Sequence, residues 1–165
     1  MIAVIMGVSG CGKTTLGERC AGALGIKYYE ADGFHPEVNI QKMSSGIPLN
    51  DEDRWPWLQL IRDEIISCQS QGRSAVFSCS ALKESYRRFL SENLAEEIIW
   101  VYLKGSFDTI FSRLEARQGH YQKADMLKSQ FADLEEPDYG IIIDIDTPLE
   151  EKVKNLSQEL RKSMS

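Results

Sequence analysis

The segment that most constrains the fold of this chain runs from Gly7 to Thr14 and reads G-V-S-G-C-G-K-T. It matches the phosphate-binding pattern G-x-x-x-x-G-K-[ST]. The segment follows the apolar run Ile2 to Met6, and apolar residues then recur at helical spacing from Lys13 to Gly25. A short, wholly apolar run is typical of a central parallel strand that helices cover on both faces. The chain is therefore predicted to begin with a buried strand, a glycine-rich turn and a helix.

Strands and helices are predicted to alternate along the rest of the chain. Further strands are expected at 28–31, 75–79, 98–103 and 141–145. Further helices are expected after Asp51 to Asp53 and up to Gly72, around 83–93, from the capping residue Ser106 to near Gly119, and after the capping box Thr147-Pro148-Leu149-Glu150. Such alternation indicates a parallel sheet with right-handed crossovers.

The length and the element order together predict the fold class. At 165 residues the chain fits one compact domain spanning 1–165. We expect a three-layer α/β fold in which helices flank a five-stranded parallel sheet. A small lid is expected over approximately 117–137.

The glycine-rich segment predicts a nucleotide-binding loop. Glycine lets successive backbone N–H groups turn inward around a phosphate at a helix N-terminus. Lys13 is expected to reach the β- and γ-phosphates of ATP, and Thr14 to place its hydroxyl on Mg²⁺. A turn that merely packs closely is the alternative for the segment, and a small residue that fits is the alternative for Cys11. The residues expected to bind the nucleotide here are Gly7, Val8, Ser9, Gly10, Cys11, Gly12, Lys13, Thr14 and Thr15.

Two acidic residues stand at the end of the second predicted strand, where ligands of an open parallel sheet collect. Asp32 is expected to accept the proton of an attacking hydroxyl, and Glu30 to assist Mg²⁺ through water. The alternative for Asp32 is a helix cap or a solvated acid.

Composition and charge disfavour several classes of partner. The net charge of −6 argues against a nucleic-acid partner, because such affinity comes largely from clustered Lys and Arg. Apolar runs such as 98–103 are too short to cross a bilayer, so no membrane partner is expected. The four cysteines, Cys11, Cys20, Cys68 and Cys79, form no C-x-x-C pair. We therefore expect a cytoplasmic protein with reduced thiols.

Several motifs in the chain resemble those of the gluconate kinases, which have the shikimate-kinase-like P-loop kinase fold. Beyond the phosphate loop they are E-A-D-G-F-H-P at 30–36, K-M-S at 42–44 with G-I-P-L at 46–49, D-E-D-R-W-P-W-L at 51–58, S-C-S-A-L-K at 78–83 with Y-R at 86–87, and S-Q-F at 129–131 with L-E-E-P at 134–137. The resemblance implies ATP-dependent phosphorylation of D-gluconate at its 6-hydroxyl to give 6-phosphogluconate. It also implies a homodimer, because the family commonly dimerises.

Gluconate presents a carboxylate and a row of hydroxyls, so its site needs a fixed cation with donors and acceptors. Arg54 is the candidate for carboxylate or acceptor contact, with an ion pair to Asp51 or Asp53 as the alternative. Trp55 and Trp57 are interpreted as packing residues. The remaining expected acceptor contacts are His35, which is equally well read as structural, and Ser80, Lys83 and Arg87, of which Arg87 has a solvated helix position as its alternative.

Two arginines one helical turn apart precede the segment that resembles a kinase lid. Arg113 and Arg117 are expected to bind the nucleotide, and Arg117 is expected to act with Lys13 and Asp32 in catalysis by stabilising charge on the γ-phosphate. The alternative for Arg117 is an exposed cation at a helix end. The segment 146–148 is expected to pass near adenine, or only to cap the last helix.

Some features depart from the general pattern and leave other functions open. The third strand ends in Ser78-Cys79-Ser80 without the acid of a usual Walker B, so the second Mg²⁺ contact is not assigned. Gly33 stands where relatives in the family that the chain resembles are expected to carry a second acid, which favours Asp32 as the base. The alternatives are a kinase for another small hydroxy acid such as shikimate, a nucleoside monophosphate kinase, and a non-enzymatic nucleotide-dependent switch, against which the absence of an N-K-x-D element counts.

Overall fold

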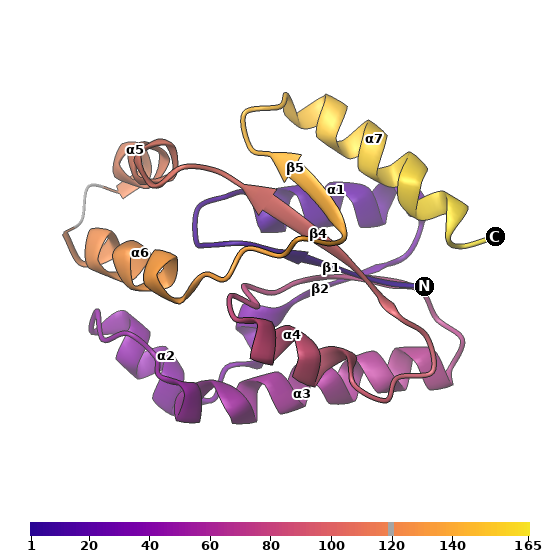
Figure 1. Cartoon of the computed structure of the whole chain (residues 1–165), viewed down its shortest axis with the longest axis horizontal. Helices are drawn as coiled ribbons and strands as arrows, with labels where there is room; N and C mark the ends of the chain where they lie inside the picture. Colours follow the sequence, from indigo (N-terminus) through magenta and orange to yellow (C-terminus); the bar gives the residue numbers. More distant parts are fainter. Residues whose placement is uncertain (119–120) are drawn as a thin grey trace.

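The computed structural model describes residues 1–118 and 121–165, and of residues 117, 118 and 121–123 it describes the backbone only. Five strands form one parallel sheet in the order β2-β3-β1-β4-β5 (Figure 1). Their bounds are β1 (Ile2–Met6), β2 (Lys27–Glu30), β3 (Ala75–Ser78), β4 (Ile98–Lys104) and β5 (Ile141–Asp144). The predicted five-stranded parallel sheet is confirmed.

Strand β1 occupies the centre of the sheet, as its apolar sequence predicted. All its residues are fully buried, and it pairs with β3 on one side and β4 on the other. The edge strand β5 alternates between half-buried and exposed residues. Because the strands are parallel, the segments that follow β1, β2 and β3 leave the sheet at one common edge.

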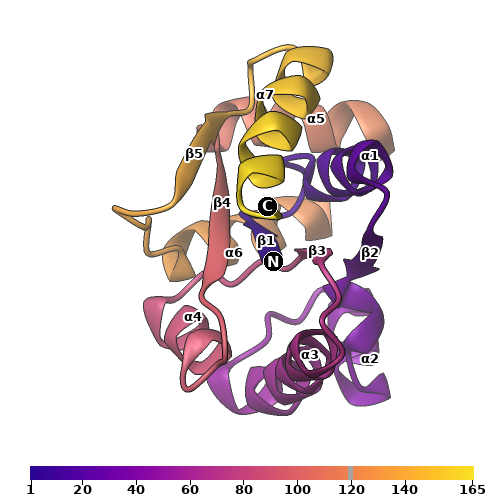
Figure 2. The same ribbon diagram turned by 90° about the vertical axis from the view of Figure 1, so that its right-hand side faces the viewer.

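Helices cover both faces of the sheet. They are α1 (Lys13–Leu24), α2 (Glu37–Ser44), α3 (Asp51–Ser70), α4 (Glu84–Ser91), α5 (Phe107–Gln118), α6 (Tyr121–Asp133) and α7 (Leu149–Lys162), with a 3-10 helix at Ala31–Phe34. Figure 2 shows α1 and α7 on one face and α3 and α4 on the other. This is the predicted three-layer α/β arrangement.

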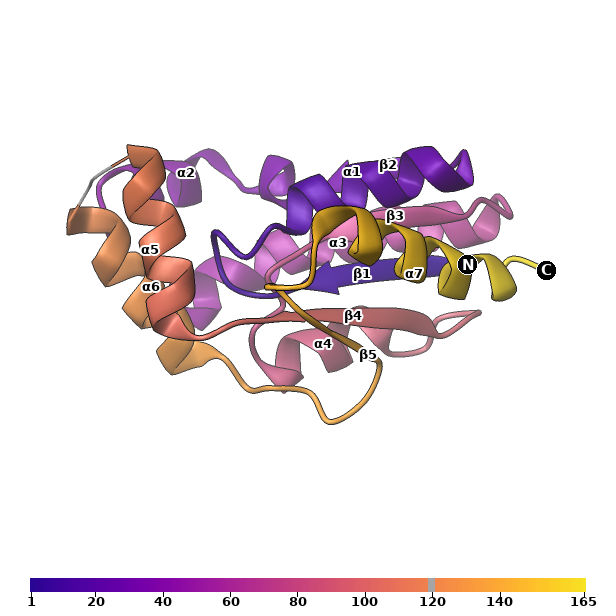
Figure 3. The same ribbon diagram turned by 90° about the horizontal axis from the view of Figure 1, so that it is seen from above.

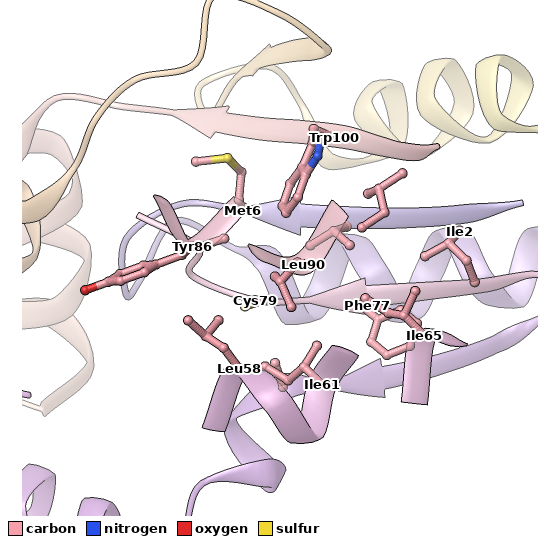
Figure 4. Packing of buried hydrophobic residues seen from close by; sticks show 14 of the residues in the cluster. Ile2, Met6, Leu58, Ile61, Ile65, Phe77, Cys79, Tyr86, Leu90 and Trp100 are labelled. Carbon is pink, nitrogen blue, oxygen red and sulfur yellow. The ribbon is translucent and has the colours of Figure 1, made fainter. Parts of the chain in front are cut away.

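Each face of the sheet has its own hydrophobic core. On the α3 and α4 face, Leu58, Ile61 and Ile65 belong to one buried cluster with alternate residues of β1 and with Trp100 of β4 (Figure 4). On the opposite face, Leu16 of α1 and Leu156 of α7 pack against Ala3 and Ile5. Because neighbouring residues of β1 point to opposite faces, its apolar run ties both layers together.

Three helices gather at one end of the sheet. Seen from above, α2, α5 and α6 lie beyond the carboxyl ends of the strands (Figure 3). They therefore surround the edge at which the phosphate loop leaves β1. Among the described residues, none of the helices combines the length and apolar content needed to cross a membrane.

The structure differs from the sequence predictions at several local points. Helix α2 was not predicted, and α6 forms within the segment predicted only as a lid. Helix α2 escapes pattern recognition because its apolar Val38 and Ile40 are exposed whereas polar Asn39 is buried. Strand β2 is shifted by one residue, since Ala31 already begins the 3-10 helix.

The helix caps also correct the sequence analysis. Ser106 caps α5 as predicted, accepting a hydrogen bond from the N–H of Thr109 at 3.2 Å. The capping box predicted at 147–150 does not form, because Pro148 is the N-cap residue of α7 and has no side chain that can accept a hydrogen bond. A capping box forms instead between Asn50 and Asp53, so α3 starts at Asp51.

Arg87 of α4 holds distant segments together. Its guanidinium donates to the carbonyls of Ala81 (2.7 Å), Leu82 (3.1 Å) and Glu135 (2.7 Å), and it also contacts Glu84 and Tyr139. The side chain is 1% exposed. Arg87 thus joins the turn before α4 to the chain that follows α6.

Replacing Arg87 by alanine is expected to lower the free energy of unfolding by about 3 kcal/mol, because several buried carbonyls lose a charged donor. Urea denaturation measures the change. The matched control is Arg88→Ala, the neighbouring exposed arginine, which is expected to change stability by less than about 0.5 kcal/mol. A similar unfolding free energy for both variants would contradict this structural role of Arg87.

Candidate active site at the carboxyl edge of the sheet

The phosphate loop is fixed between β1 and α1 by close approaches that require glycine. A Cβ on Gly7 would lie 2.8 Å from the Cys11 Sγ, and one on Gly10 would lie 2.8 Å from the Leu114 side chain. Both residues have positive φ angles, 148° at Gly7 and 82° at Gly10. The loop therefore keeps its narrow turn at the N-terminus of α1 only with glycine at these positions.

Lys13 lies over the loop that precedes it. Its Nζ donates to the carbonyls of Gly7 and Val8, both at 3.0 Å. Its own carbonyl accepts a hydrogen bond from Ser78 Oγ at the end of β3, at 3.1 Å. The first turn of α1 is thus fixed to the neighbouring strand, with the ammonium directed at the loop.

Thr14 and Glu30 meet in a short hydrogen bond. Thr14 Oγ1 donates to Glu30 Oε2 at 2.5 Å, and the Tyr28 hydroxyl donates to the same oxygen at 2.6 Å. The pKa of Tyr28 is raised by its burial and by Glu30, so the phenol keeps its proton and remains a donor. The acid that accompanies the loop hydroxyl therefore comes from β2. Strand β3 ends in Ser78 instead of an acid, and the Ser78 Oγ lies 2.8 Å from the Tyr28 hydroxyl.

This pair is the arrangement in which a divalent cation could be held. Within the described part of the chain there is no cluster of three or more His, Cys, Asp or Glu side chains that could bind a metal by themselves. Mg²⁺ usually keeps several waters and uses one or two carboxylates together with substrate phosphates. The Thr14 hydroxyl and the Glu30 carboxylate at the mouth of the phosphate loop fit that preference.

Asp32 lies in the 3-10 helix that follows β2, and its side chain opens to a cleft that it shares with Lys13. Limited solvation in the cleft raises the pKa of its carboxyl, Lys13 opposes the shift, and Glu30 adds to it. A carboxylate with a raised pKa accepts a proton more readily than an ordinary aspartate. The polar residues around this cleft are Ser9, Lys13, Asp32, His35, Arg54, Ser80, Ser129 and Gln130.

His35 is a neutral, buried wall of the cleft. Its ring stacks on Trp57 with centroids 4.2 Å apart, and its Nδ1 lies 3.2 Å from Asn39 Nδ2. Because an amide nitrogen can only donate, Nδ1 is the acceptor and Nε2 carries the proton. Burial, assisted by the charge of Arg54, lowers the pKa of His35 to about 4.

Arg54 of α3 lines one side of the cleft and connects that side to α6. It donates to the Tyr86 hydroxyl at 2.7 Å and pairs with Asp133 at 2.8 Å. This partner differs from the alternatives considered in the sequence, since Asp51 pairs with Lys83 at 2.9 Å and Asp53 with Lys42 at 2.8 Å. A guanidinium has five N–H donors, so Arg54 retains donors that can bind a ligand.

The other predicted site residues fall into two groups. Near the cleft, Ser80 lines the wall and its carbonyl accepts from the Gly7 N–H at 3.3 Å. Within the loop, the side chains of Val8 and Cys11 are buried, in keeping with the interpretation of Cys11 as a small residue that fits. Thr15 is exposed on the first turn of α1. Gly12, the last glycine of the loop, is the N-cap residue of α1.

The second group lies outside the cleft. The ammonium of Lys83 is engaged with Asp51 and packs over Tyr86, and Arg87 is buried with its donors bound to the protein. Arg113 lies 3.3 Å from both the Ile145 carbonyl and Asp146, beside the loop that follows β5. The side chain of Arg117 lies outside the described residues.

The structure adds residues to which the sequence analysis gave no role. Gln130 accepts from the Ser9 N–H at 2.7 Å and donates to Ser9 Oγ at 2.9 Å. Asp133 binds Arg54, and Tyr28 and Ser78 support Glu30 and Lys13. Gln130 belongs to the S-Q-F motif that carries part of the family resemblance, but a motif by itself does not show which atoms a side chain meets.

A family model described as shikimate kinase matches residues 9–140 of the chain. A curated relative, the thermoresistant gluconokinase of Escherichia coli K12, is 43% identical over 165 aligned residues that cover 98% of this chain and 94% of the relative. The gluconokinase of Gluconobacter oxydans is 45% identical over 135 residues, covering 81% of this chain and 75% of the relative.

Solved structures of a gluconokinase and a sugar kinase are also similar to this chain. A gluconokinase from Sinorhizobium meliloti superposes with a TM-score of 0.83 at 38% identity, over 98% of this chain and 95% of that one. An unliganded sugar kinase from a Janibacter species superposes with a TM-score of 0.88 at 40% identity, over 97% and 94% of the two chains.

Protonation of His35 is expected to destabilise the fold in acid. Its pKa is about 4 in the folded chain, below the ordinary histidine value of 6.5. Between these values the unfolded chain binds the extra proton, so stability falls as the pH drops from 6.5 towards 4, by about 3 kcal/mol in total. Urea denaturation at pH 7 and pH 4 measures the change, and His35→Gln is expected to lose correspondingly less. An equal loss in both proteins would contradict the buried, neutral state of His35.

Proposed function

The chain belongs to the shikimate kinase family and, within it, to the gluconokinases, and we propose that it transfers the γ-phosphoryl group of ATP to the 6-hydroxyl of D-gluconate. The products are 6-phosphogluconate and ADP. The observation that carries the proposal is one cleft in which Lys13 of the phosphate loop, the carboxylate of Asp32 and the cation of Arg54 lie together.

On the donor side, the loop amides and Lys13 would bind the β- and γ-phosphates. Bound Mg²⁺ would neutralise charge on the triphosphate, with Thr14 and Glu30 as the residues that hold it. Glu30 is supported for this role by Tyr28, whose hydroxyl fixes the carboxylate 2.5 Å from Thr14 Oγ1. Arg113, beside the loop after β5, would contribute at the base end of the nucleotide, and Arg117 would close over the γ-phosphate.

On the acceptor side, Asp32 would orient the primary hydroxyl and take its proton. Its raised pKa and its place beside Lys13 support this role. Arg54 would bind the substrate carboxylate with its remaining donors, and His35 and Ser80 would bind hydroxyls. Lys83 and Arg87 contribute to the same wall indirectly, through Asp51 and through the turn at 81–82.

We infer a homodimer that works in the cytoplasm without a nucleic-acid or membrane partner. The support is the family resemblance for the dimer, and the net charge of −6 for the absence of a nucleic-acid partner.

A coupled assay of ADP release tests the proposed function directly. With ATP and Mg²⁺, turnover on D-gluconate is expected to exceed that on shikimate, AMP and other sugar acids by at least about 100-fold, because a site built for several hydroxyls leaves polar groups unpaired with a poorer match. A preference for shikimate or another hydroxy acid would show that this compound, and not D-gluconate, is the substrate. Nucleotide binding without any turnover would favour a nucleotide-dependent switch.

Replacing Asp32 by asparagine is expected to lower kcat about 100- to 10,000-fold, because the acceptor hydroxyl loses its proton acceptor while the side chain keeps its size. The dissociation constant of ATP is expected to change little. Stopped-flow turnover and calorimetry of nucleotide binding measure the two effects. The control is Glu37→Gln, an exposed acid at the start of α2. Equal losses of turnover and ATP affinity would remove the assigned role of Asp32.

A further inference from the structure

Helix α6 is attached to the phosphate loop through one side chain. The Gln130 amide makes two hydrogen bonds to Ser9: its Oε1 accepts from the backbone N–H at 2.7 Å, and its Nε2 donates to Oγ at 2.9 Å. Two bonds from one planar amide fix its orientation as well as its distance. The third residue of the loop is thus positioned by a side chain 121 residues later in the sequence.

The same helix is attached to the acceptor side of the cleft one turn further on. Asp133 pairs with the buried Arg54 at 2.8 Å. The chain then continues along the cleft wall, where the Glu135 N–H donates to the Leu82 carbonyl at 2.8 Å and Glu135 Oε1 accepts from the Glu84 N–H at 2.9 Å. Residues 130 and 133, three positions apart, lie on one face of α6. That face therefore contacts both the donor loop and the acceptor arginine.

From this geometry we propose that Gln130 is a positioning residue for phosphoryl transfer. Acting through Ser9, it fixes α6 on the phosphate loop, so that the loop and Arg54 keep one relative position while the two substrates are bound. The inference rests on the proposed kinase function and adds a residue for which the sequence gave no role. Gln130 is half-buried and lines the cleft beside Lys13 and Asp32.

An amide suits this position better than the other polar groups. Ser9 offers one backbone donor and one hydroxyl acceptor, and a glutamine side chain matches both at once. A glutamate of the same shape can accept from both the Ser9 N–H and the Ser9 hydroxyl, but its negative charge would lie beside a triphosphate. Glutamine therefore provides the matching contacts without repelling the nucleotide.

Loss of the Gln130 contact has a specific chemical consequence. The loop itself remains held by Lys13, which bonds the Gly7 and Val8 carbonyls, so nucleotide binding persists. With α6 no longer held on Ser9, water competes with the sugar hydroxyl. In that side reaction the water oxygen bonds to the γ-phosphorus, the bond to the β-γ bridging oxygen breaks, and ADP, inorganic phosphate and a proton are released.

The experiment measures ADP and 6-phosphogluconate separately, together with kcat and KM for both substrates. Gln130→Ala is expected to lower kcat about 10- to 100-fold, because misplaced reactants react more slowly. The number of ADP molecules formed per molecule of 6-phosphogluconate is expected to rise above one. Gln130→Glu is expected to be at least as impaired despite its matching shape. The control is Lys128→Ala, an exposed position on the same helix, which is expected to behave as the parent enzyme.

Ser9→Ala gives an independent test because it removes only the bond to Nε2. Its defect is expected to be smaller than that of Gln130→Ala, and the double variant is expected to be no worse than Gln130→Ala, since both changes remove the same contact. Unchanged coupling and kcat in Gln130→Ala, additive losses in the double variant, or a fully active Gln130→Glu would each overturn the inference. If the parent enzyme shows no turnover on gluconate, the proposed function fails, and the inference fails with it.

Discussion

The structure depends on the fit of the glycine-rich turn between a buried central strand and the first turn of α1. Side chains at Gly7 or Gly10 would collide with Cys11 or Leu114, so the loop holds its shape only with glycine there. The strand that leads into it is buried on both faces, and the two hydrophobic cores that it joins make this strand the fixed reference for every other element. Because neighbouring parallel strands end at the same edge, the loop, Glu30, Asp32 and Ser80 share one end of the sheet.

The acid that accompanies the loop hydroxyl is supplied by β2, the strand from which the sequence analysis expected it. The strand next to β1 ends in Ser78, which bonds the Lys13 carbonyl, and the carboxylate comes from Glu30 one strand further out. Tyr28 joins these two positions, since its hydroxyl reaches both the Glu30 carboxylate and Ser78. The burial that raises the Tyr28 pKa keeps the phenol a donor, so two hydroxyl donors, from Thr14 and Tyr28, hold the acid in place.

Two pairs of contacts make α6 part of the site. Gln130 contacts the phosphate loop and Asp133 contacts Arg54, so one short helix contacts both sides of the cleft. A kinase must bring donor and acceptor together and keep water out, and a helix held at both sides serves both needs. The anchoring of the following chain by Arg87 extends this support to the base of α4, so Arg87 supports the cleft wall from outside the cleft.

The sequence by itself determined the features that depend on neighbours along the chain: the phosphate loop with its strand and helix, the order of the elements, and the apolar faces of α3 and α7. These follow from local periodicity and from glycine geometry, which a sequence displays directly. Helix α2 was missed because it exposes its apolar residues, and the capping box moved from 147–150 to Asn50 and Asp53 because Pro148 cannot provide the side-chain acceptor. Only the tertiary structure decided that Arg54 pairs with Asp133, that Arg87 is buried, and that Gln130 meets Ser9, because these contacts join residues far apart in the chain and depend on how the layers pack.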